Sequence, residues 1–424
     1  MRVVQLDSEE GGRLRARLQA RALSDLRAVT PAVSEIVSDV RERGEKALTA
    51  YGERWDELQR GQALRVSQDE MQSALAALSP QTRDALSTAA ANIRNFAELQ
   101  LPQTRFVETR SGVMLGQIVR ALDAVGCYVP GGRYPLPSTL LMTVIPAQVA
   151  GVKRIVVCSP RPSEATLAAA ALLGVSEFYR IGGAHAVAAM AFGTERIPAV
   201  NKIVGPGNQY VTAAKKLVAE SGAVSIDMLA GPTEALILSR AGHPRFIAAD
   251  LVAQAEHDPL ACSLFVTTRN ELAKSVARIV NELTAGNPTA REAIESNGAA
   301  IVTRSWEEAI AVANEIGSEH LTIDDEKDLE RINCAGSIFI GDYSAQPLGD
   351  YVSGPNHVLP TAGTARFRGG LSAADFVKLI SVQKVSRSAY AQLATAAETL
   401  AEIEGLAGHQ FALQVRREKE VASA

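Results

Sequence analysis

The spacing of apolar residues divides the chain into a helical first part and an α/β remainder. Up to about residue 100, apolar side chains recur every three or four positions, which is the spacing of one helix face. This part is therefore predicted to be mainly helical, with helices at residues 9–28, 32–51, 67–76 and 81–99.

From residue 105 onward, the pattern changes to short, continuous apolar runs, and a stretch with helical spacing follows most of them. Unalternated runs of this kind are typical of parallel strands that helices cover on both faces. The central architecture is therefore predicted to be α/β. The expected strands are residues 154–158, 177–181, 202–204, 235–238, 263–267, 299–302 and 337–340.

A glycine-rich segment around residues 230–232 separates two groups of these strands. We infer from it that one α/β domain is inserted within a larger one. The expected division is a helical N-terminal arm at 1–22, a larger α/β domain at 23–126 and 233–370, an inserted α/β domain at 127–232, and a C-terminal arm at 371–424.

The C-terminal arm is expected to be helical, because the helical spacing returns after Gly370. Its stretch 390–404 is long, rich in alanine and amphipathic. A single arm cannot bury such an apolar face alone, so we expect the protein to be a homodimer that the arm holds together.

Composition excludes several classes of partner. The 424 residues carry a formal charge of -4, without the basic excess that a phosphate backbone demands, so nucleic acid is not expected. The most apolar stretch, residues 140–152, is short and is broken by Pro146 and Gln148, and the chain starts with charged residues. Neither a membrane span nor a signal peptide is expected. Four widely spaced cysteines favour a reducing cytoplasm.

Candidate chemistry centres on histidine, of which the chain has only six. Four of them, His257, His320, His357 and His409, occur in short stretches with carboxylate or carboxamide side chains. Imidazole both binds zinc and transfers protons near neutral pH. This pattern therefore indicates a metal site with an acid/base pair beside it.

A metal site is suggested first by Gln254 and His257, which are three residues apart in a stretch with helical spacing and would share one helix face. Asp350 would add a carboxylate and His409 a second imidazole. Two nitrogen and two oxygen donors suit zinc. Alternatively, Gln254 and His257 are ordinary surface or capping residues.

The adjacent Glu319 and His320 are the candidate acid/base pair, since a carboxylate and an imidazole at a helix end could each handle a different proton. The alternative is a plain junction between a helix and the apolar run that starts at Leu321.

Glycine-rich turns supply candidate anion contacts, although the usual dinucleotide fingerprint is missing. Two turns follow expected strands and a third follows the apolar run 127–129 in a similar position, where backbone N–H groups could face a phosphate. Each turn could equally be simple turn chemistry. The turns are Pro130-Gly-Gly132, Gly182-Gly-Ala-His185 and Gly205-Pro-Gly-Asn208.

Together these residues resemble one family, histidinol dehydrogenase, over nearly the whole chain. The motifs that carry the resemblance are long and occur in the family's order. They are Tyr128-Val-Pro-Gly-Gly, Gly205-Pro-Gly-Asn208, Ile226-Asp-Met-Leu-Ala-Gly-Pro-Thr-Glu234, Gln254-Ala-Glu-His257, Ser318-Glu-His320-Leu, Gly349-Asp-Tyr-Val-Ser-Gly-Pro-Asn-His357-Val-Leu-Pro-Thr and Glu404-Gly-Leu-Ala-Gly-His409.

The resemblance implies two α/β/α sandwich domains of incomplete Rossmann-like type with helical N-terminal and C-terminal arms. It implies one Zn²⁺ per subunit, with His409 delivered from the neighbouring subunit. Glu319 and His320 would be catalytic. The implied zinc ligands are Gln254, His257, Asp350 and His409, the implied NAD contacts are Tyr128, His185 and Asn208, and the implied substrate contacts are Thr233, Glu404, His320 and the four zinc ligands.

The activity that the resemblance implies is the four-electron oxidation of histidinol to histidine through bound histidinaldehyde with two NAD, which completes histidine biosynthesis. Two positions depart from the family: His185 stands where glutamine is expected, and Thr233 stands where serine is expected but keeps the hydroxyl group. His243 and His357 receive no clear role, although His243 is expected in a turn and His357 near Asp350. The rival functions are oxidation of another polar alcohol, zinc-dependent hydrolysis and a non-catalytic binding module.

Overall fold

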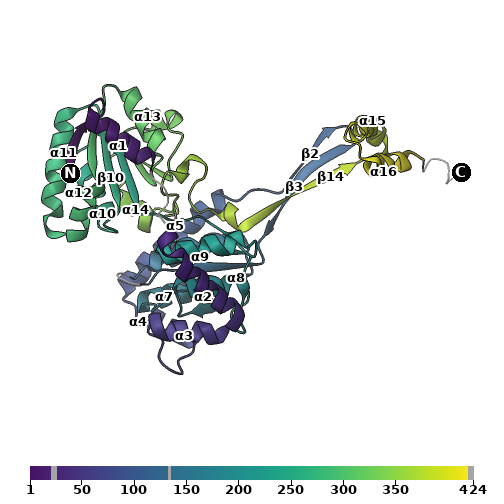
Figure 1. Ribbon diagram of the computed structural model, residues 1–424, viewed down its shortest axis with the longest axis horizontal. Helices are drawn as coiled ribbons and strands as arrows, with labels where there is room; N and C mark the ends of the chain where they lie inside the picture. The colour runs from purple at the N-terminus through teal and green to yellow at the C-terminus, as the bar shows by residue number, and fades with distance from the viewer. Residues whose placement is uncertain (21–25, 132–134, 419–424) are drawn as a thin grey trace. The chain divides into compact units, whose positions relative to one another are not determined.

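A computed structural model describes residues 1–20, 26–131 and 135–418, which form two compact units. The first unit contains residues 1–100 and 122–376, and the second contains residues 101–121 and 377–424. Figure 1 shows the elements of both units along the chain.

The first unit contains a parallel sheet of six strands in the order β1-β11-β10-β9-β12-β13. Its strands are largely apolar and do not alternate with polar residues, because helices cover both faces. In β9, for example, Leu236 and Leu238 point to one face and Ile237 to the other. The strands are β1 (Arg2–Gln5), β9 (Glu234–Leu238), β10 (Cys262–Thr267), β11 (Ala299–Val302), β12 (His320–Ile323) and β13 (Ser337–Ile340).

Two layers of helices enclose this sheet. The helices α1 (Glu9–Gln19) and α13 (Trp306–Ile316) pack on the face of Leu236. On the opposite face lie α10 (Pro244–Ala255), α11 (Asn270–Leu283) and α12 (Pro288–Asn297) (Figure 1). The result is an α/β/α sandwich, completed by the short helix α14 (Gln346–Tyr351) and by 3-10 turns at Thr284–Gly286, Glu326–Arg331 and Thr364–Arg366. A further 3-10 turn, Ala373–Phe376, packs with Phe376 in the core of the other sandwich of this unit.

A second parallel sheet in the first unit has five strands in the order β6-β5-β4-β7-β8. Helices α2, α3, α8 and α9 cover one face of it, and α4, α5, α6 and α7 cover the other. It is therefore a second α/β/α sandwich. Its strands are β4 (Ala124–Tyr128), β5 (Arg154–Cys158), β6 (Glu177–Tyr179), β7 (Lys202–Val204) and β8 (Ser225–Ile226).

The helices of this second sandwich begin after a 3-10 turn at Leu26–Ala28. They are α2 (Thr30–Arg43), α3 (Glu45–Trp55), α4 (Gln68–Ala77), α5 (Pro80–Leu99), α6 (Pro137–Val149), α7 (Glu164–Leu172), α8 (Gly183–Phe192) and α9 (Gln209–Glu220).

The two sheets share one strand order. In each, the first strand of the βα series is central, the second and third lie on one side of it, and the fourth and fifth lie on the other. The chain therefore reverses direction across the sheet beside β4 in the five-stranded sheet and beside β9 in the six-stranded sheet. Such reversal points open a crevice at the carboxyl ends of the strands.

The expected α/β architecture with two sandwiches is confirmed, and all seven expected strands are present within about two residues of their expected bounds. The helix expected at 32–51 is two helices instead, because Gly44 adopts a φ of 55° between them. The expected helix at 9–28 includes residues 21–25, which lie outside the described residues, as does the domain boundary placed at residue 22.

The helices expected to belong with residues 233–370 pack elsewhere. Side chains of α2, α3, α4 and α5 belong to the core of the five-stranded sandwich, while β1 and α1 belong to the six-stranded one. Helical periodicity identifies the buried face of a helix but not the sheet that covers it. Grouping 23–126 with 233–370 was therefore wrong for residues 30–99.

The second unit consists of an antiparallel sheet and two helices. Its strands are ordered β14-β3-β2, and Val377 of β14 pairs with Ala121 of β3. After residue 370 a wholly helical arm was expected, but residues 377–385 form the strand β14. The sequence did not indicate this strand, because its partner, β3, lies far away along the chain. The elements are β2 (Arg105–Arg110), β3 (Val113–Ala121), β14 (Val377–Val385), α15 (Arg387–Ile403) and α16 (Ala407–Glu418) (Figure 1).

Among the helices of the described residues, none is both long and apolar enough to cross a lipid bilayer.

The core of the six-stranded sandwich can be tested at Phe265, which is fully buried in β10. The variant Phe265→Ala is expected to lower the free energy of unfolding by about 3–5 kcal/mol, because a large cavity replaces the ring. Leu283→Ala, at a side chain that is 48% exposed, is the control and should change stability by no more than about 0.5 kcal/mol. Denaturant unfolding measures both, and equal effects would contradict the assigned core.

Candidate active site

The expected acid/base pair lies at the start of β12. Helix α13 ends at Ile316, and after three intervening residues the chain enters the six-stranded sheet at His320. Glu319 and His320 are only 7% and 3% exposed. The expectation of a helix-to-strand junction was therefore correct, and the same junction buries both ionisable side chains.

The position of this pair explains why Gln254 and Asp350 approach it. His320 is the first residue of its strand, so it lies at the amino-terminal edge of the parallel sheet. A helix that follows a parallel strand runs back toward that edge. Gln254 is the penultimate residue of α10, which follows β9, and Asp350 belongs to α14, which follows β13. Both therefore reach the edge where His320 begins.

The carboxylate of Asp350 connects the site residues. Its Oδ1 lies 3.0 Å from Nε2 of His320, and its Oδ2 accepts a hydrogen bond of 2.9 Å from Nε2 of Gln254. Burial acts to raise the pKa of Asp350, but the hydrogen bond and the charge of His320 outweigh burial and leave that pKa below its usual value. Asp350 is therefore a carboxylate at neutral pH.

Glu319 has a different electrostatic environment from Asp350. Burial raises the pKa of Glu319 to about 7, and the favourable charge of His320 offsets this only in part. Its Oε2 accepts a hydrogen bond of 3.0 Å from the backbone N–H of Glu234 and lies 3.8 Å from Nδ1 of His320. A carboxyl group with this pKa can both accept and donate a proton near neutral pH.

His320 is held on one side only. Burial acts to lower its pKa, but the carboxylates of Glu319 and Asp350 outweigh burial and raise that pKa. Since a carboxylate can only accept, Nε2 must carry the proton that it shares with Asp350. Within the described residues, Nδ1 of His320 is buried without a hydrogen-bond partner. When the imidazole is neutral, Nδ1 therefore carries a lone pair that no hydrogen bond of the described residues engages.

His257 lies outside the helix predicted for it. Helix α10 ends at Ala255, so His257 follows it in an exposed turn, where its N–H donates to the carbonyl of Gln254 over 3.4 Å. The prediction that Gln254 and His257 share one helix face was wrong. Across residues 1–20, 26–131 and 135–418, no group of three or more His, Cys, Asp and Glu side chains is arranged to hold a metal.

Glu404 and His409 belong to the second unit. Glu404 follows the end of α15, and His409 lies in the first turn of α16. Both line a largely apolar hollow of about 770 Å³ between these helices. The structure thus brings together Glu319, His320, Gln254 and Asp350 in one unit, and Glu404 and His409 in the other.

Two of the expected dinucleotide contacts lie at the carboxyl edge of the five-stranded sheet. Tyr128 ends β4, and its buried hydroxyl accepts a hydrogen bond of 3.2 Å from the N–H of Gly183. Asn208 follows β7 and caps α9 by accepting bonds from the N–H groups of Tyr210 and Val211. These strands flank the reversal point of the sheet. Gly132, expected in the same group, lies outside the described residues.

His185 is turned into the protein. It is 1% exposed, and its Nε2 lies 2.8 Å from Oδ2 of Asp56, which also accepts the N–H of Gly182. The rings of Tyr51 and Trp55 lie within 6 Å of its ring, at centroid distances of 5.7 and 5.9 Å. Asp56 carries no motif signal, so the sequence could not indicate this partner.

Thr233 and the two unassigned histidines are also placed. Thr233 precedes β9, and its carbonyl accepts the N–H of Cys262 over 2.8 Å. His243 caps α10, which agrees with the turn expected there. His357 donates from Nδ1 to the backbone carbonyl of Asp350 over 2.7 Å, so it supports the loop that carries Asp350.

Fold and site together indicate an α/β enzyme, with a buried carboxylate–imidazole pair that is suited to proton transfer. The family model described as histidinol dehydrogenase matches residues 19–417. This chain therefore belongs to the histidinol dehydrogenase family, and it is an oxidoreductase.

Individual relatives agree with this assignment. The histidinol dehydrogenase of Methanothermobacter thermautotrophicus is 46% identical over 406 residues, which is 93% of this chain and 95% of the relative. That of Geobacillus kaustophilus is 46% identical over 400 residues, 92% of this chain and 94% of the relative. The crystal structure of histidinol dehydrogenase from Elizabethkingia anophelis matches with a TM-score of 0.92 at 35% identity, covering 99% and 98% of the two chains.

The support that His357 gives to Asp350 can be tested by His357→Leu. Loss of the donor should leave the carbonyl of Asp350 unsatisfied and lower the free energy of unfolding by about 1–3 kcal/mol. Thr139→Val is the matched control. It removes the contact of Oγ1 of Thr139 with Nε2 of the same ring, at 3.2 Å, but keeps the bond from Nδ1 of His357 to the carbonyl of Asp350. Thermal and denaturant unfolding compare the two, and an equal loss would show that the bond to Asp350 contributes little.

Proposed function

We propose that this protein oxidises L-histidinol to L-histidine through enzyme-bound L-histidinaldehyde, with one Zn²⁺ per subunit and two NAD. The proposal would place it at the end of histidine biosynthesis. The observation that carries it is the buried contact of Glu319, His320 and Asp350 in a chain that matches histidinol dehydrogenases over more than nine-tenths of its length.

The donor chemistry at the amino edge of the six-stranded sheet fits zinc. Gln254 and Asp350 already touch and offer oxygen donors, His257 lies three residues from Gln254, and His409 would add a second imidazole. When bound, the ion would orient the amino alcohol and polarise its hydroxyl group. Thr233 and Glu404 are the further residues that would contact the substrate.

His320 is suited to take the hydroxyl proton. Because Asp350 engages the Nε2–H of His320, Nδ1 is the ring nitrogen that can accept the hydroxyl proton. Asp350 also stabilises the imidazolium that results, since it remains a carboxylate at neutral pH. The same nitrogen would return the proton to solvent and act again in the second oxidation.

Glu319 is suited to activate the water that adds to the aldehyde. Its pKa of about 7 makes it a stronger base than an exposed carboxylate and leaves much of it ionised at neutral pH. Its place beside His320, 3.8 Å away, lets the two groups divide the proton transfers between them. Burial excludes other water, which protects a reactive amino aldehyde.

The carboxyl edge of the five-stranded sheet is the proposed NAD site, because open α/β sheets bind nucleotides where the chain reverses. Tyr128 and Asn208 flank that point. NAD would accept one hydride in each oxidation. His185 would act from behind the turn at Gly182 and Gly183, since Asp56 contacts both its ring and the N–H of Gly182.

The proposed assembly is a cytoplasmic homodimer in which His409 reaches the zinc of the neighbouring subunit. Glu404 and His409 share the hollow between α15 and α16, and Leu400 and Ile403 beside it are 60% and 76% exposed. Apolar side chains in that position favour contact with another chain.

One test addresses the whole proposal. Purified protein supplied with zinc, NAD and histidinol should form two NADH for each histidine, and chelation should abolish turnover. NADH without histidine would favour the alternative, which is oxidation of another polar alcohol on the same scaffold. Turnover at full rate after removal of all zinc would refute the metal site.

The variant Glu319→Gln should slow the aldehyde-to-acid half selectively, by on the order of 10²-fold or more, because glutamine cannot act as a base. Single-turnover assays that start from histidinol and from histidinaldehyde separate the halves. Glu315→Gln, on the neighbouring helix α13, is the control. Equal impairment of both halves by Glu319→Gln would contradict the assigned division of roles.

The variant His409→Asn should retain zinc more weakly, since one imidazole ligand is lost. Metal content after dialysis against a buffered chelator measures the effect, and we expect the zinc affinity to fall at least about tenfold. His243→Asn, at the histidine that caps α10, serves as the control and should retain zinc like the unchanged protein. Identical retention by both variants would exclude His409 as a ligand.

A further inference from the structure

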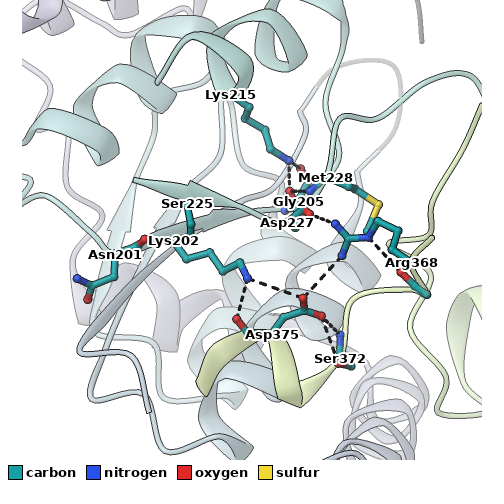
Figure 2. A network of polar contacts seen from close by, with 11 residues as sticks. Asn201, Lys202, Gly205, Lys215, Ser225, Asp227, Met228, Arg368, Ser372 and Asp375 are labelled. Carbon is teal, nitrogen blue, oxygen red and sulfur yellow. Dashed lines mark hydrogen bonds and ion pairs between the residues drawn. The ribbon is translucent and has the colours of Figure 1, made fainter. Parts of the chain in front are cut away.

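A buried ion pair holds the turn that follows β7. Nζ of Lys215 in α9 bonds to Oδ1 of Asp227, which lies just beyond β8, and the two side chains are 2% and 0% exposed (Figure 2). Neither residue has a part in the proton transfers proposed above. Asp227 belongs to a motif of the family resemblance, the stretch from Ile226 to Glu234, whose other end forms part of the site.

The pair hydrogen-bonds to both the carbonyl oxygen and the N–H of one residue, Gly205. Nζ of Lys215 donates to the carbonyl oxygen of Gly205 over 2.9 Å, and Oδ2 of Asp227 accepts the N–H of Gly205 over 2.7 Å. Oδ1 of Asp227 also accepts the N–H of Met228. The donor and the acceptor of a single backbone position are thus bound by two side chains of opposite charge.

Gly205 can be replaced by no other residue without disturbance. Its φ is 116°, which disfavours side chains, and a Cβ there would collide with the carbonyl oxygen of Tyr128. The turn Gly205-Pro-Gly-Asn208 therefore lies directly against the end of β4. This is the reversal point of the five-stranded sheet, where the proposed NAD site lies.

Stability alone does not account for a pair of this kind. Taking two charges out of water is costly, and well-packed apolar residues of similar volume often stabilise a core equally well or better. Apolar residues could not, however, hydrogen-bond to Gly205. What the charges provide in addition is a fixed position for its two peptide groups.

The network continues from Asp227 to the segment that follows the 3-10 turn at Thr364–Arg366. Arg368 donates to the backbone carbonyl of Asp227 and pairs with Asp375 at 3.7 Å (Figure 2). Asp375 also pairs with Lys202 at 3.7 Å, and Lys202 begins β7. Residues 368–375 therefore contact both Lys202, in the strand before the turn, and Asp227, which binds Gly205 in the turn.

We propose that Lys215 and Asp227 are positioning residues of the nucleotide site, which fix Gly205 so that the turn from Gly205 to Asn208 is preformed for the dinucleotide. The inference rests on the proposed function in that NAD is the ligand of this turn. Neither side chain touches the nucleotide, because both are sealed in the protein.

The decisive comparison is between Lys215→Met and the double variant Lys215→Met/Asp227→Asn. The single variant leaves a buried carboxylate without its partner, so it should lose both thermal stability and NAD affinity. The double variant removes that charge and should regain most of the melting temperature. Since the carbonyl of Gly205 still lacks a donor, its KM for NAD should remain raised by on the order of tenfold, with kcat within about twofold.

Recovery of the KM for NAD together with the melting temperature in the double variant would overturn the proposal, because the pair would then matter only for stability. An equal rise in the KM for histidinol would also overturn it. The control is Arg154→Met, which breaks the ion pair with Glu177 at 2.6 Å in the same sheet but at its amino edge. It should leave the KM for NAD unchanged.

A readout without any substrate separates this inference from the proposed function. Amide hydrogen exchange at residues 205, 207 and 208 should become faster in the double variant than in the unchanged protein and stay normal in Arg154→Met. Unaltered exchange in the double variant would refute the positioning role even in an active enzyme. Unchanged protein that fails to oxidise histidinol would refute only the proposed function.

Discussion

The site in the six-stranded sandwich depends on the hydrogen bonds that the carboxylate of Asp350 makes. One oxygen pairs with His320 at the start of β12, the other accepts from Gln254 at the end of α10, and His357 supports its backbone. An uncompensated buried charge is costly, so these groups must be satisfied together or not at all. The arrangement fixes the tautomer of His320 and leaves its other nitrogen available for chemistry.

Much of this organisation could be predicted from the sequence. The unalternated apolar runs identified seven parallel strands because burial on both faces leaves no other pattern, and the rarity of histidine led to Glu319 and His320. Long-range pairings could not be predicted in this way. Neither the strand β14, which pairs with β3 across more than half of the chain, nor the contact of His185 with Asp56 leaves a local signal. The end of α10 before His257 was missed because helical spacing continues past it.

The groups on which the proposed function rests lie at opposite edges of the two sheets, whose βα series have the same strand order. In the five-stranded sheet, the turns beside β4 and β7 lie at the carboxyl ends, where glycine allows close approach of the backbone. In the six-stranded sheet, the ionisable residues lie at the amino ends, where returning helices converge. Turns suit a ligand that is bound by backbone peptide groups. Helix ends and strand starts instead bring ionisable side chains close together. One topology therefore offers two kinds of site.

The strand β1 has a consequence for the order in which the protein can be built. Arg2–Gln5 pairs only along β11, and the residue opposite Arg2 is Ala299. During synthesis this strand must therefore wait for nearly three hundred residues before its partner strand exists, while all five strands of the other sheet are made and can pair in the meantime. Contacts of such large sequence separation slow folding. Until Ala299 is made, the strand has no partner, and its backbone N–H and C=O groups are open to pairing with another chain.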